Sequence, residues 1–329
     1  MRGHPDNEHQ TGGSTVNFAT FGAHFETMSL LTVGTVAFDS IETPFGSVDN
    51  VIGGAATYIA WAASYLTRPI QIVSIIGGDF PLEELTALRE RGVDLTGIKQ
   101  VPDGKSFYWA GRYHDNMISR DTLTTDLNVL ADFDPVLPEA YRSAEYLMLG
   151  NLTPDIQRSV IEQMSKRPNV IALDTMNFWM DTALESLLEV LRLIDILIIN
   201  DEEARQLSGE YSLVKAASAI QEMGPRFLVI KKGEHGALLF SDNRVFFAPG
   251  LPLLEVVDPT GAGDTFAGGF IGHIARTGDT SFENMRRAVI YGSVMASFCV
   301  EDFSLAKLRN LSDDEIERRY QEFRDLVHF

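Results

Sequence analysis

The sequence predicts an α/β fold: a mostly parallel sheet covered by helices on both faces, with a small second β-sheet beside it. From Met28 onward, short apolar runs alternate with longer amphipathic runs, and strands that alternate with helices form parallel sheets of this kind. Two adjacent strand-like runs between residues 107 and 123 interrupt that alternation. The 329 residues are 45% apolar and 22% charged, which is ordinary for a globular chain with a full core.

The strands expected in the large sheet are short apolar runs bounded by polar or turn-forming residues. They are Leu30–Gly34, Ile70–Ile76, Tyr146–Leu149, Val170–Asp174, Ile196–Asn200 and Phe227–Lys231. The helices expected between them are Gly54–Leu66, Pro81–Arg91, Pro154–Ser165, Thr182–Leu193, Asp201–Leu207 and Leu213–Met223. The second of these helices begins with Pro and has Gly92 just beyond its end, which are typical helix boundaries.

Two further runs, Phe107–Tyr113 and Met117–Leu123, are separated by a turn-like segment and predict a hairpin. Together with the segment around Ile41–Val48, they are expected to form a side sheet or lid over residues 36–50 and 104–125. No repeat or linker follows residue 28, so one domain is expected over 28–329. Residues 1–27 are polar and aperiodic, which predicts a disordered tail, a cloning-derived extension or a misassigned start.

The charge balance excludes several classes of partner. The chain has 46 Asp and Glu against 27 Lys and Arg, a net charge of −19, which disfavours nucleic acid and anionic membranes. The single cysteine, Cys299, lies in an apolar run and is expected to be a buried thiol, so no disulfide framework forms. No apolar stretch approaches the roughly 18–20 residues that span a bilayer, and no signal pattern is present. A cytoplasmic protein is expected.

The most informative stretch is Val256–Phe270, VVDPTGAGDTFAGGF. An apolar run leads into an Asp-Pro-Thr segment, two glycines and then Asp264, where a helical pattern begins. Glycines let the backbone turn sharply and approach a ligand, and the first N–H groups of a helix attract anions. Gly261, Ala262 and Gly263 are therefore expected to form an anion-binding cradle.

Asp264 has two interpretations at this point. It could cap the helix, a role worth about 1 kcal/mol, or it could be a general base that takes the proton from a hydroxyl attacking a phosphoryl group. The residue pattern alone favours neither. Further along, Gly268, Gly269 and Gly272 are expected to let this helix pack closely against the sheet.

The run DPTGAGDTFAGGF closely resembles the C-terminal signature of the ribokinase-like, PfkB-type carbohydrate kinases. The resemblance extends over nearly all of residues 28–329. Gly34 followed by Asp39 is similar to the family's first strand and its substrate-binding Asp, and Gly53 and Gly54 resemble its N-terminal Gly-Gly signature, which forms a hinge and contacts the sugar. The resemblance implies a ribokinase-like three-layer αβα sandwich with a small β-sheet lid.

Two more segments resemble the family's nucleotide and metal elements. Asn200 and Glu203, in INDEEARQLSG, look like its N-x-x-E element, which implies that they order Mg²⁺ through water and that Asn200 lies near the phosphates. The run KGEHG resembles its G-x-x-G nucleotide loop. The nucleotide-binding residues that the resemblance implies are Asn200, Lys232, Gly233, Gly236 and Thr260.

The reaction implied is in-line phosphoryl transfer from ATP, with Mg²⁺, to a sugar hydroxyl. Asp264 would remove the hydroxyl proton, and the Gly261–Gly263 amides would neutralise the charge that develops on the moving group. Closing the lid would exclude water. Dimerisation through the lid sheets is common in similar kinases, so a homodimer is expected by analogy.

The chain departs from the family pattern at Tyr58, where most members carry an Asn that binds the sugar. Tyr58 either packs within its helix or changes the substrate pocket. Phe107, Trp109 and Tyr113 could stack on a nucleoside base or a sugar, or pack the lid on the core. A sugar kinase is expected, with an adenosine-kinase-like nucleoside kinase as the alternative. The substrate residues expected are Asp39, Gly53, Gly54, Tyr58 and Trp109.

Other residues have a structural and a functional interpretation. Asp174 and Asn177 resemble a D-x-N-x-R run of the family, with Trp179 where Arg is common, and they either shape the cleft or end a strand and stabilise a turn. Arg112 and Arg120 flank the hairpin turn; they are either solvated charges or contacts for an anionic substrate such as a sugar phosphate.

Asp258 and Thr260 match only part of the family's monovalent-cation site, and residues 295–305 contain no glycine, so potassium activation is not predicted.

Three other enzyme classes fail on their motifs. A P-loop ending at Gly104-Lys105-Ser106 would need Gly at Lys99, and a Rossmann fingerprint starting at Gly261 would need Gly at Phe266. The seven His are scattered without H-E-x-x-H, which excludes the common zinc hydrolases. A non-catalytic binding regulator on the same fold remains a further alternative, whose hallmark would be loss of the base.

Overall fold

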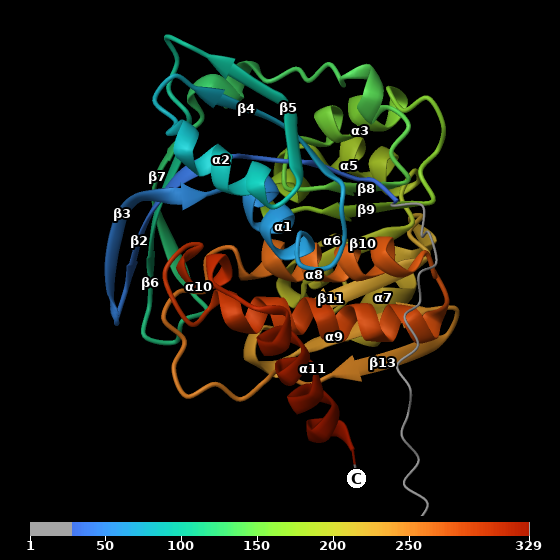
Figure 1. Ribbon diagram of the computed structural model, residues 1–329. Helices are drawn as coiled ribbons and strands as arrows, with labels where there is room; N and C mark the ends of the chain where they lie inside the picture. The colour runs from blue at the N-terminus through green and yellow to red at the C-terminus, as the bar shows by residue number, and fades with distance from the viewer. Residues whose placement is uncertain (1–27, 329) are drawn as a thin grey trace, which may run out of the picture.

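The computed structural model describes residues 28–328 as a nine-stranded sheet between two layers of helices, with a separate four-stranded sheet at one side (Figure 1). The segment 1–27, expected to be a tail or an extension, lies outside the described residues. Among the helices of residues 28–328, none has both the length and the apolar composition that crossing a membrane requires.

The large sheet has the strand order β13-β12-β11-β10-β9-β8-β1-β4-β5. Its strands from β11 to β5 pair in parallel, and only β12 and β13 are antiparallel. Their bounds are β1 Leu30–Val33, β4 Ile70–Gly77, β5 Val93–Val101, β8 Tyr146–Leu149, β9 Val170–Asp174, β10 Ile196–Asn200, β11 Phe227–Lys231, β12 Ala237–Ser241 and β13 Arg244–Ala248.

All six strands expected in this sheet are confirmed, because each is an apolar run that is buried on both faces. The sequence predicted neither β5 nor the β12–β13 hairpin. Strand β5, at one edge of the sheet, mixes exposed polar residues with buried ones, so it lacks the continuous apolar run that marks a central strand. Strands β12 and β13, at the other edge, do contain short apolar runs, ALLF and VFFA, which the sequence analysis did not assign to strands.

Helices cover both faces of the sheet, as the alternating pattern predicts. One face packs against α1 Ala55–Ala63, α2 Leu82–Glu90, α8 Ala262–Thr277, α9 Phe282–Cys299, α10 Ala306–Arg309 and α11 Asp313–Val327. The other packs against α3 Pro154–Glu162, α4 Asn177–Thr182, α5 Leu184–Leu191, α6 Asp201–Ser208 and α7 Leu213–Glu222. The predicted helix Thr182–Leu193 is wrong at its start. Thr182 is the last residue of α4, and α5 begins at Leu184, because Ala183 between them is not helical (φ −145°, ψ 36°).

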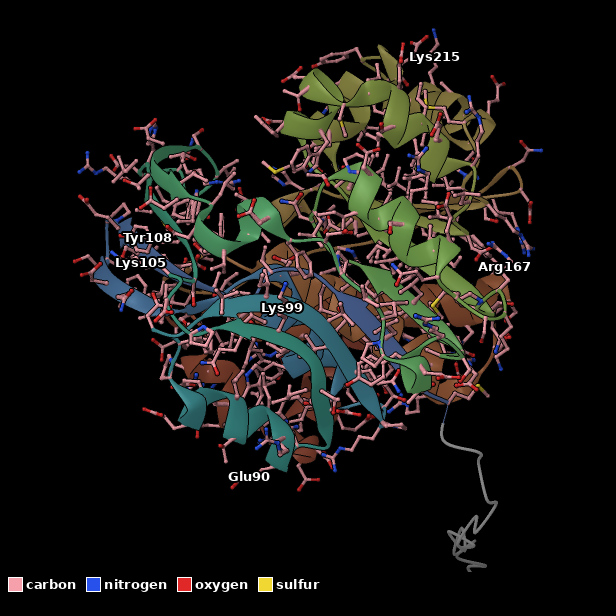
Figure 2. The ribbon with its side chains drawn as sticks, turned by 90° about the horizontal axis from the view of Figure 1, so that it is seen from above. Glu90, Lys99, Lys105, Tyr108, Arg167 and Lys215 are labelled. Carbon is pink, nitrogen blue, oxygen red and sulfur yellow. The ribbon has the colours of Figure 1, made fainter. Side chains whose placement is uncertain are left out.

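The small sheet has the order β3-β2-β6-β7, formed by β2 Ala37–Thr43, β3 Gly46–Gly53, β6 Phe107–Tyr113 and β7 Arg120–Asp126. It stands at the left of Figure 1, beside the ends of the large sheet's strands, and Figure 2 shows Lys105 and Tyr108 at that margin of the molecule. Strand β7 begins later than the predicted Met117. The reason is a longer turn, in which Asn116 Oδ1 accepts hydrogen bonds from the N–H groups of Ile118 and Ser119.

Helix α8 packs closely on α1 and α9, which corrects the expectation that its glycines face the sheet. A Cβ on Gly268 would lie 2.4 Å from the carbonyl oxygen of Ile59 in α1, and one on Gly272 would lie 3.0 Å from the Cα of Ala63. A Cβ on Gly269 would lie 2.7 Å from the carbonyl oxygen of Tyr291 in α9. The three glycines therefore set how closely α8 approaches its neighbouring helices.

We predict that Gly268→Ala destabilises the protein by about 1–3 kcal/mol, because its Cβ would overlap backbone that must move, although Ala favours helix by about 1 kcal/mol. Thermal unfolding measures the change. Gly209→Ala is the control: its φ of 71° costs strain, but no atom lies within 4 Å of the new Cβ. Equal stability of Gly268→Ala and the wild type would contradict the close-packing argument.

Candidate active site

Polar residues gather where the parallel strands of the large sheet end. Asp174 is the last residue of β9, Asn200 of β10 and Lys231 of β11, and these strands are neighbours. The first turn of α8 meets the same edge, because a Cβ on Gly263 would lie 2.9 Å from Nζ of Lys231. This is the edge at which open α/β sheets bind ligands.

The predicted cradle residues lie at the N-terminus of α8. Gly261 is its N-cap residue, with a φ of 73° that favours glycine. The N–H of Ala262 donates to the carbonyl oxygen of Pro259 at 3.2 Å. A turn therefore uses the donor of Ala262, and the part of Ala262 in the cradle stays a prediction. Within residues 28–328, the N–H groups of Gly261, Gly263 and Asp264 have no hydrogen-bond partner.

Asp264 lies in the first turn of α8 but does not cap the helix, because the N-cap residue is Gly261 and no N–H group of the described residues donates to the Asp264 carboxylate. Its carboxylate makes no hydrogen bond within the described part of the chain. Burial, helped by the charges of Asp174 and Glu203 and opposed by Lys231 and Arg120, raises the pKa of Asp264 to about 7. An unpaired carboxylate beside free amides is thereby kept available to accept a proton.

Lys231 was absent from the residues expected at the site, yet its side chain lies beside the cradle. Its Nζ donates to Oδ2 of Asp174 at 3.1 Å. Burial lowers the pKa of Lys231, but Asp174, Glu203 and Asp264 outweigh that effect and raise it, so the side chain stays charged. One signal was present in the sequence: a lysine ending a buried apolar strand needs a partner at the sheet edge.

Gly53 and Gly54 have different roles at the junction of β3 and α1. A Cβ on Gly53 would lie 1.9 Å from Oδ2 of Asp39, so this glycine makes room for that carboxylate. Gly54 has a φ of 93°, and a Cβ there would lie 2.5 Å from the carbonyl oxygen of Thr35. Asp39 is 5% exposed, and burial, with the charges of Asp258 and Asp264, raises its pKa to about 7.

Tyr58 lies under the cradle. It is 1% exposed, and a Cβ on Gly261 would lie 2.4 Å from its ring. Its hydroxyl finds no partner with hydrogen-bond geometry among residues 28–328. The ring therefore supports the turn at Gly261 from below, and a direct contact of Tyr58 with a substrate stays a prediction.

The small sheet presents one face to this site. Asp39 pairs with Trp109 between the parallel strands β2 and β6, so both lie on one face with Gly111 and Tyr113. The Thr260 hydroxyl donates to the Tyr113 hydroxyl at 3.2 Å, which connects this face to the residue before Gly261. The indole of Trp109 lies across Gly111, where a Cβ would come within 2.2 Å of the ring. We call this the site face of the small sheet.

Asn200 and Glu203 form the capping box of α6. Asn200 Oδ1 accepts the N–H of Glu203 at 2.8 Å, and Glu203 Oε2 accepts the N–H of Asn200 at 2.7 Å. Burial, opposed by the charge of Lys231 and helped by that of Asp174, raises the pKa of Glu203 to about 7. One carboxylate oxygen of Glu203 remains outside the capping box. No group of three metal-ligating side chains occurs among residues 28–328.

The predicted nucleotide loop is a tight turn between β11 and β12. Gly233 and Gly236 both have positive φ, 55° and 83°, and the N–H of Lys232 donates to the carbonyl oxygen of Gly236. The ammonium of Lys232 lies 5.9 Å from the ring centre of Phe247 in β13, so it points along the sheet edge. The nucleotide contacts of this loop stay predictions.

Asp258 is fully buried and ties two loops together. Its carboxylate accepts the N–H groups of Thr260 at 2.8 Å and Ser304 at 3.1 Å, which joins the start of α8 to the segment after α9. Cys299 is 1% exposed, and burial raises the pKa of its thiol to about 12, which confirms the expected buried cysteine. Trp179 in α4 donates from Nε1 to Oδ1 of Asn151, just after β8, at 2.8 Å, so this contact lies outside the small sheet.

We predict that Asp264→Asn stabilises the folded protein at pH 8 by about 1–2 kcal/mol. The folded state binds this proton more tightly than the unfolded chain, so ionising Asp264 costs stability as pH rises through 7. Below the ordinary pKa of Asp, the carboxyl is protonated in both states and this cost in folding free energy vanishes. The stabilisation by Asp264→Asn should therefore be smaller at pH 5 than at pH 8. Unfolding temperatures at both pH values test this, with exposed Asp134→Asn as a control that changes neither. Destabilisation at both would indicate a helix-stabilising role.

Comparison with known proteins relates this chain to a family of kinases. The model of the pfkB family carbohydrate kinases matches residues 29–309. A cytidine kinase from Thermococcus kodakarensis is 29% identical over 253 residues, 76% of this chain and 89% of that protein. A ribokinase from Haemophilus influenzae is 28% identical over 261 residues, 75% of this chain and 80% of that one.

The fold is also that of solved ribokinase-like structures. A protein described as a ribokinase II from E. coli, solved with ATP and Mg²⁺, superposes with a TM-score of 0.74 at 22% identity. The match covers 90% of this chain and 99% of the other. The ribokinase-like architecture expected from the sequence is confirmed, and the chain belongs to the pfkB family of carbohydrate kinases.

Proposed function

We propose that this kinase transfers the γ-phosphoryl group of ATP to a hydroxyl of a sugar or sugar derivative. The observation that carries the proposal is the first turn of α8, where the Asp264 carboxylate caps nothing and stands beside the free amides of Gly261 and Gly263. A base with a pKa near neutrality next to an anion-binding helix end is the pair of groups that phosphoryl transfer to an alcohol needs.

In the proposed reaction, Asp39 binds hydroxyls of the acceptor and one hydroxyl approaches the γ-phosphorus. The hydroxyl oxygen forms the new O–P bond while the bond between the γ-phosphorus and the oxygen that bridges it to the β-phosphorus breaks. The hydroxyl proton passes to Asp264. ADP leaves with the bridging oxygen. The cradle amides stabilise the charge on the transferring group in place, and Lys231 adds a fixed positive charge beside Gly263.

Mg²⁺ fits the residues present if the phosphates and water supply most of its ligands, which is how Mg²⁺ is commonly held in kinases. Glu203 has one carboxylate oxygen outside the capping box, and Asn200 stands beside it at the end of β10. These two would order the hydrated ion. When bound, the ion would neutralise charge on the ATP phosphates.

For the nucleotide, we propose contacts with Thr260 and with the β11–β12 turn, through Lys232, Gly233 and Gly236. The small sheet would act as a lid, because its site face already reaches Thr260 through Tyr113. Its closure would remove water that could otherwise attack ATP.

A nucleoside is the second candidate acceptor. One relative is named a cytidine kinase and another a ribokinase, so the two names share ribose and differ in the base. Trp109 on the site face offers an aromatic surface beside Asp39. A free sugar needs only the carboxylate, whereas a nucleoside would also contact the ring.

We predict that one sugar or nucleoside stimulates ADP release from Mg-ATP in a coupled assay over a panel of sugars, sugar phosphates and nucleosides. Stimulation by sugars alone would identify a carbohydrate kinase. Stimulation by cytidine or adenosine would identify a nucleoside kinase, in which Trp109 would contact the base. Absence of stimulation by the whole panel, with ATP binding intact, would support the non-catalytic regulator.

We predict that Asp264→Asn lowers turnover about 10²–10⁴-fold, the usual contribution of a general base, while the variant still binds ATP in a calorimeter. In the wild type the active form is the carboxylate, so kcat/KM should fall about tenfold for each pH unit below 7. The variant should lack this slope. Near-full activity of Asp264→Asn would refute the base assignment.

A further inference from the structure

Arg120 differs from the other basic residues around the hairpin turn of the small sheet, Arg112 and His114. Arg112 forms an ion pair with Glu42 at 2.9 Å, and His114 contacts Asp121 at 3.0 Å. The guanidinium of Arg120 has neither an ion pair nor a hydrogen bond within residues 28–328. The two arginines that flank the same turn therefore have different surroundings.

The strand register places Arg120 on the site face. It stands directly opposite Tyr113 in the antiparallel pair of β6 and β7, and residues directly opposite project from the same face. Arg112 precedes Tyr113 in β6, so it projects from the other face. The guanidinium of Arg120 lies 5.9 Å from the ring centre of Trp109, the strand neighbour of Asp39.

The groups that Arg120 faces are mostly acidic. Its charge lowers the pKa of both Asp264 and Glu203, against burial, which raises both. The other cation at this edge, Lys231, is already held by Asp174. In a chain of net charge −19, a cation near the cradle would also offset the repulsion of an approaching nucleotide.

We propose that Arg120 contacts phosphoryl oxygens of the bound ligand, either on the γ-phosphoryl group of ATP or on a phosphate carried by the acceptor. The inference rests on the proposed function and adds a residue of the small sheet to its site. The planar guanidinium suits two phosphoryl oxygens at once. The α8 amides would hold the phosphoryl group from the side of the large sheet, and Arg120 would hold it from the small sheet. The charge of the ligand would thus draw α8 and the small sheet together.

The test compares Arg120→Met and Arg120→Lys with the matched control Arg112→Met. The control removes an exposed ion pair from the other face, which should change little. Calorimetry measures binding of Mg-ADP and of Mg-AMP-PNP, which keeps a γ-phosphoryl group. Steady-state kinetics measure kcat and KM with a neutral acceptor and with a phosphorylated one.

If the γ-phosphoryl group is the contact, Arg120→Met weakens AMP-PNP binding about 10- to 100-fold, leaves ADP binding unchanged and lowers kcat with every acceptor. If the acceptor phosphate is the contact, both nucleotides bind normally and KM rises for the phosphorylated acceptor alone. Arg120→Lys should recover part of either loss. The control should resemble the wild type in every measurement.

Equal behaviour of Arg120→Met and Arg112→Met, with an active wild type, would overturn the role of Arg120 while leaving the proposed function intact. A wild type that phosphorylates no acceptor would instead refute the proposed function. In that case the difference in AMP-PNP binding between the two arginine variants still decides whether Arg120 contacts a phosphoryl group.

Discussion

The site depends on the close approach of α8 to α1. Gly268 and Gly272 place the backbone of α8 against α1, and Gly261 rests on the buried ring of Tyr58, a residue of α1. These contacts determine where the first turn of α8 lies relative to the strand ends. The free amides and Asp264 then face the edge of the sheet rather than bulk solvent. A bulkier residue at any of these glycines would move the cradle away from Lys231 and Asp174.

The electrostatics of the site oppose stability. Asp174, Glu203 and Asp264 lie near one lysine, and burial adds to their repulsion, so the pKa values of Glu203 and Asp264 rise to about 7. Asp174 forms an ion pair with Lys231 at 3.1 Å. Glu203 is engaged in a helix cap, whereas Asp264 has no partner. Asp264 is thus the carboxylate with the least local stabilisation and the one best placed to accept a proton. Active sites commonly keep such groups although they lower the stability of the fold.

The two faces of the small sheet have different environments because strand residues alternate. The site face carries Asp39, Trp109 and Tyr113. The Tyr113 hydroxyl accepts a hydrogen bond from the hydroxyl of Thr260, just before α8. The opposite face carries Arg112 with its exposed partner Glu42. A ligand between the two sheets would thus meet a carboxylate, an indole and an arginine from one side and helix amides from the other.

The alternation of strands and helices, the six buried strands and the residues around Asp264 could be predicted from the sequence, because each is encoded locally by an apolar run or a glycine pattern. The sequence left open whether Asp264 caps α8, and it treated Arg112 and Arg120 alike. The tertiary structure settles these points, and it shows that the partner of the strand-ending Lys231 is Asp174. Register, helix packing and the partner of a buried charge depend on segments far apart in the chain, such as Asp174 and Lys231, and no local pattern encodes their distance.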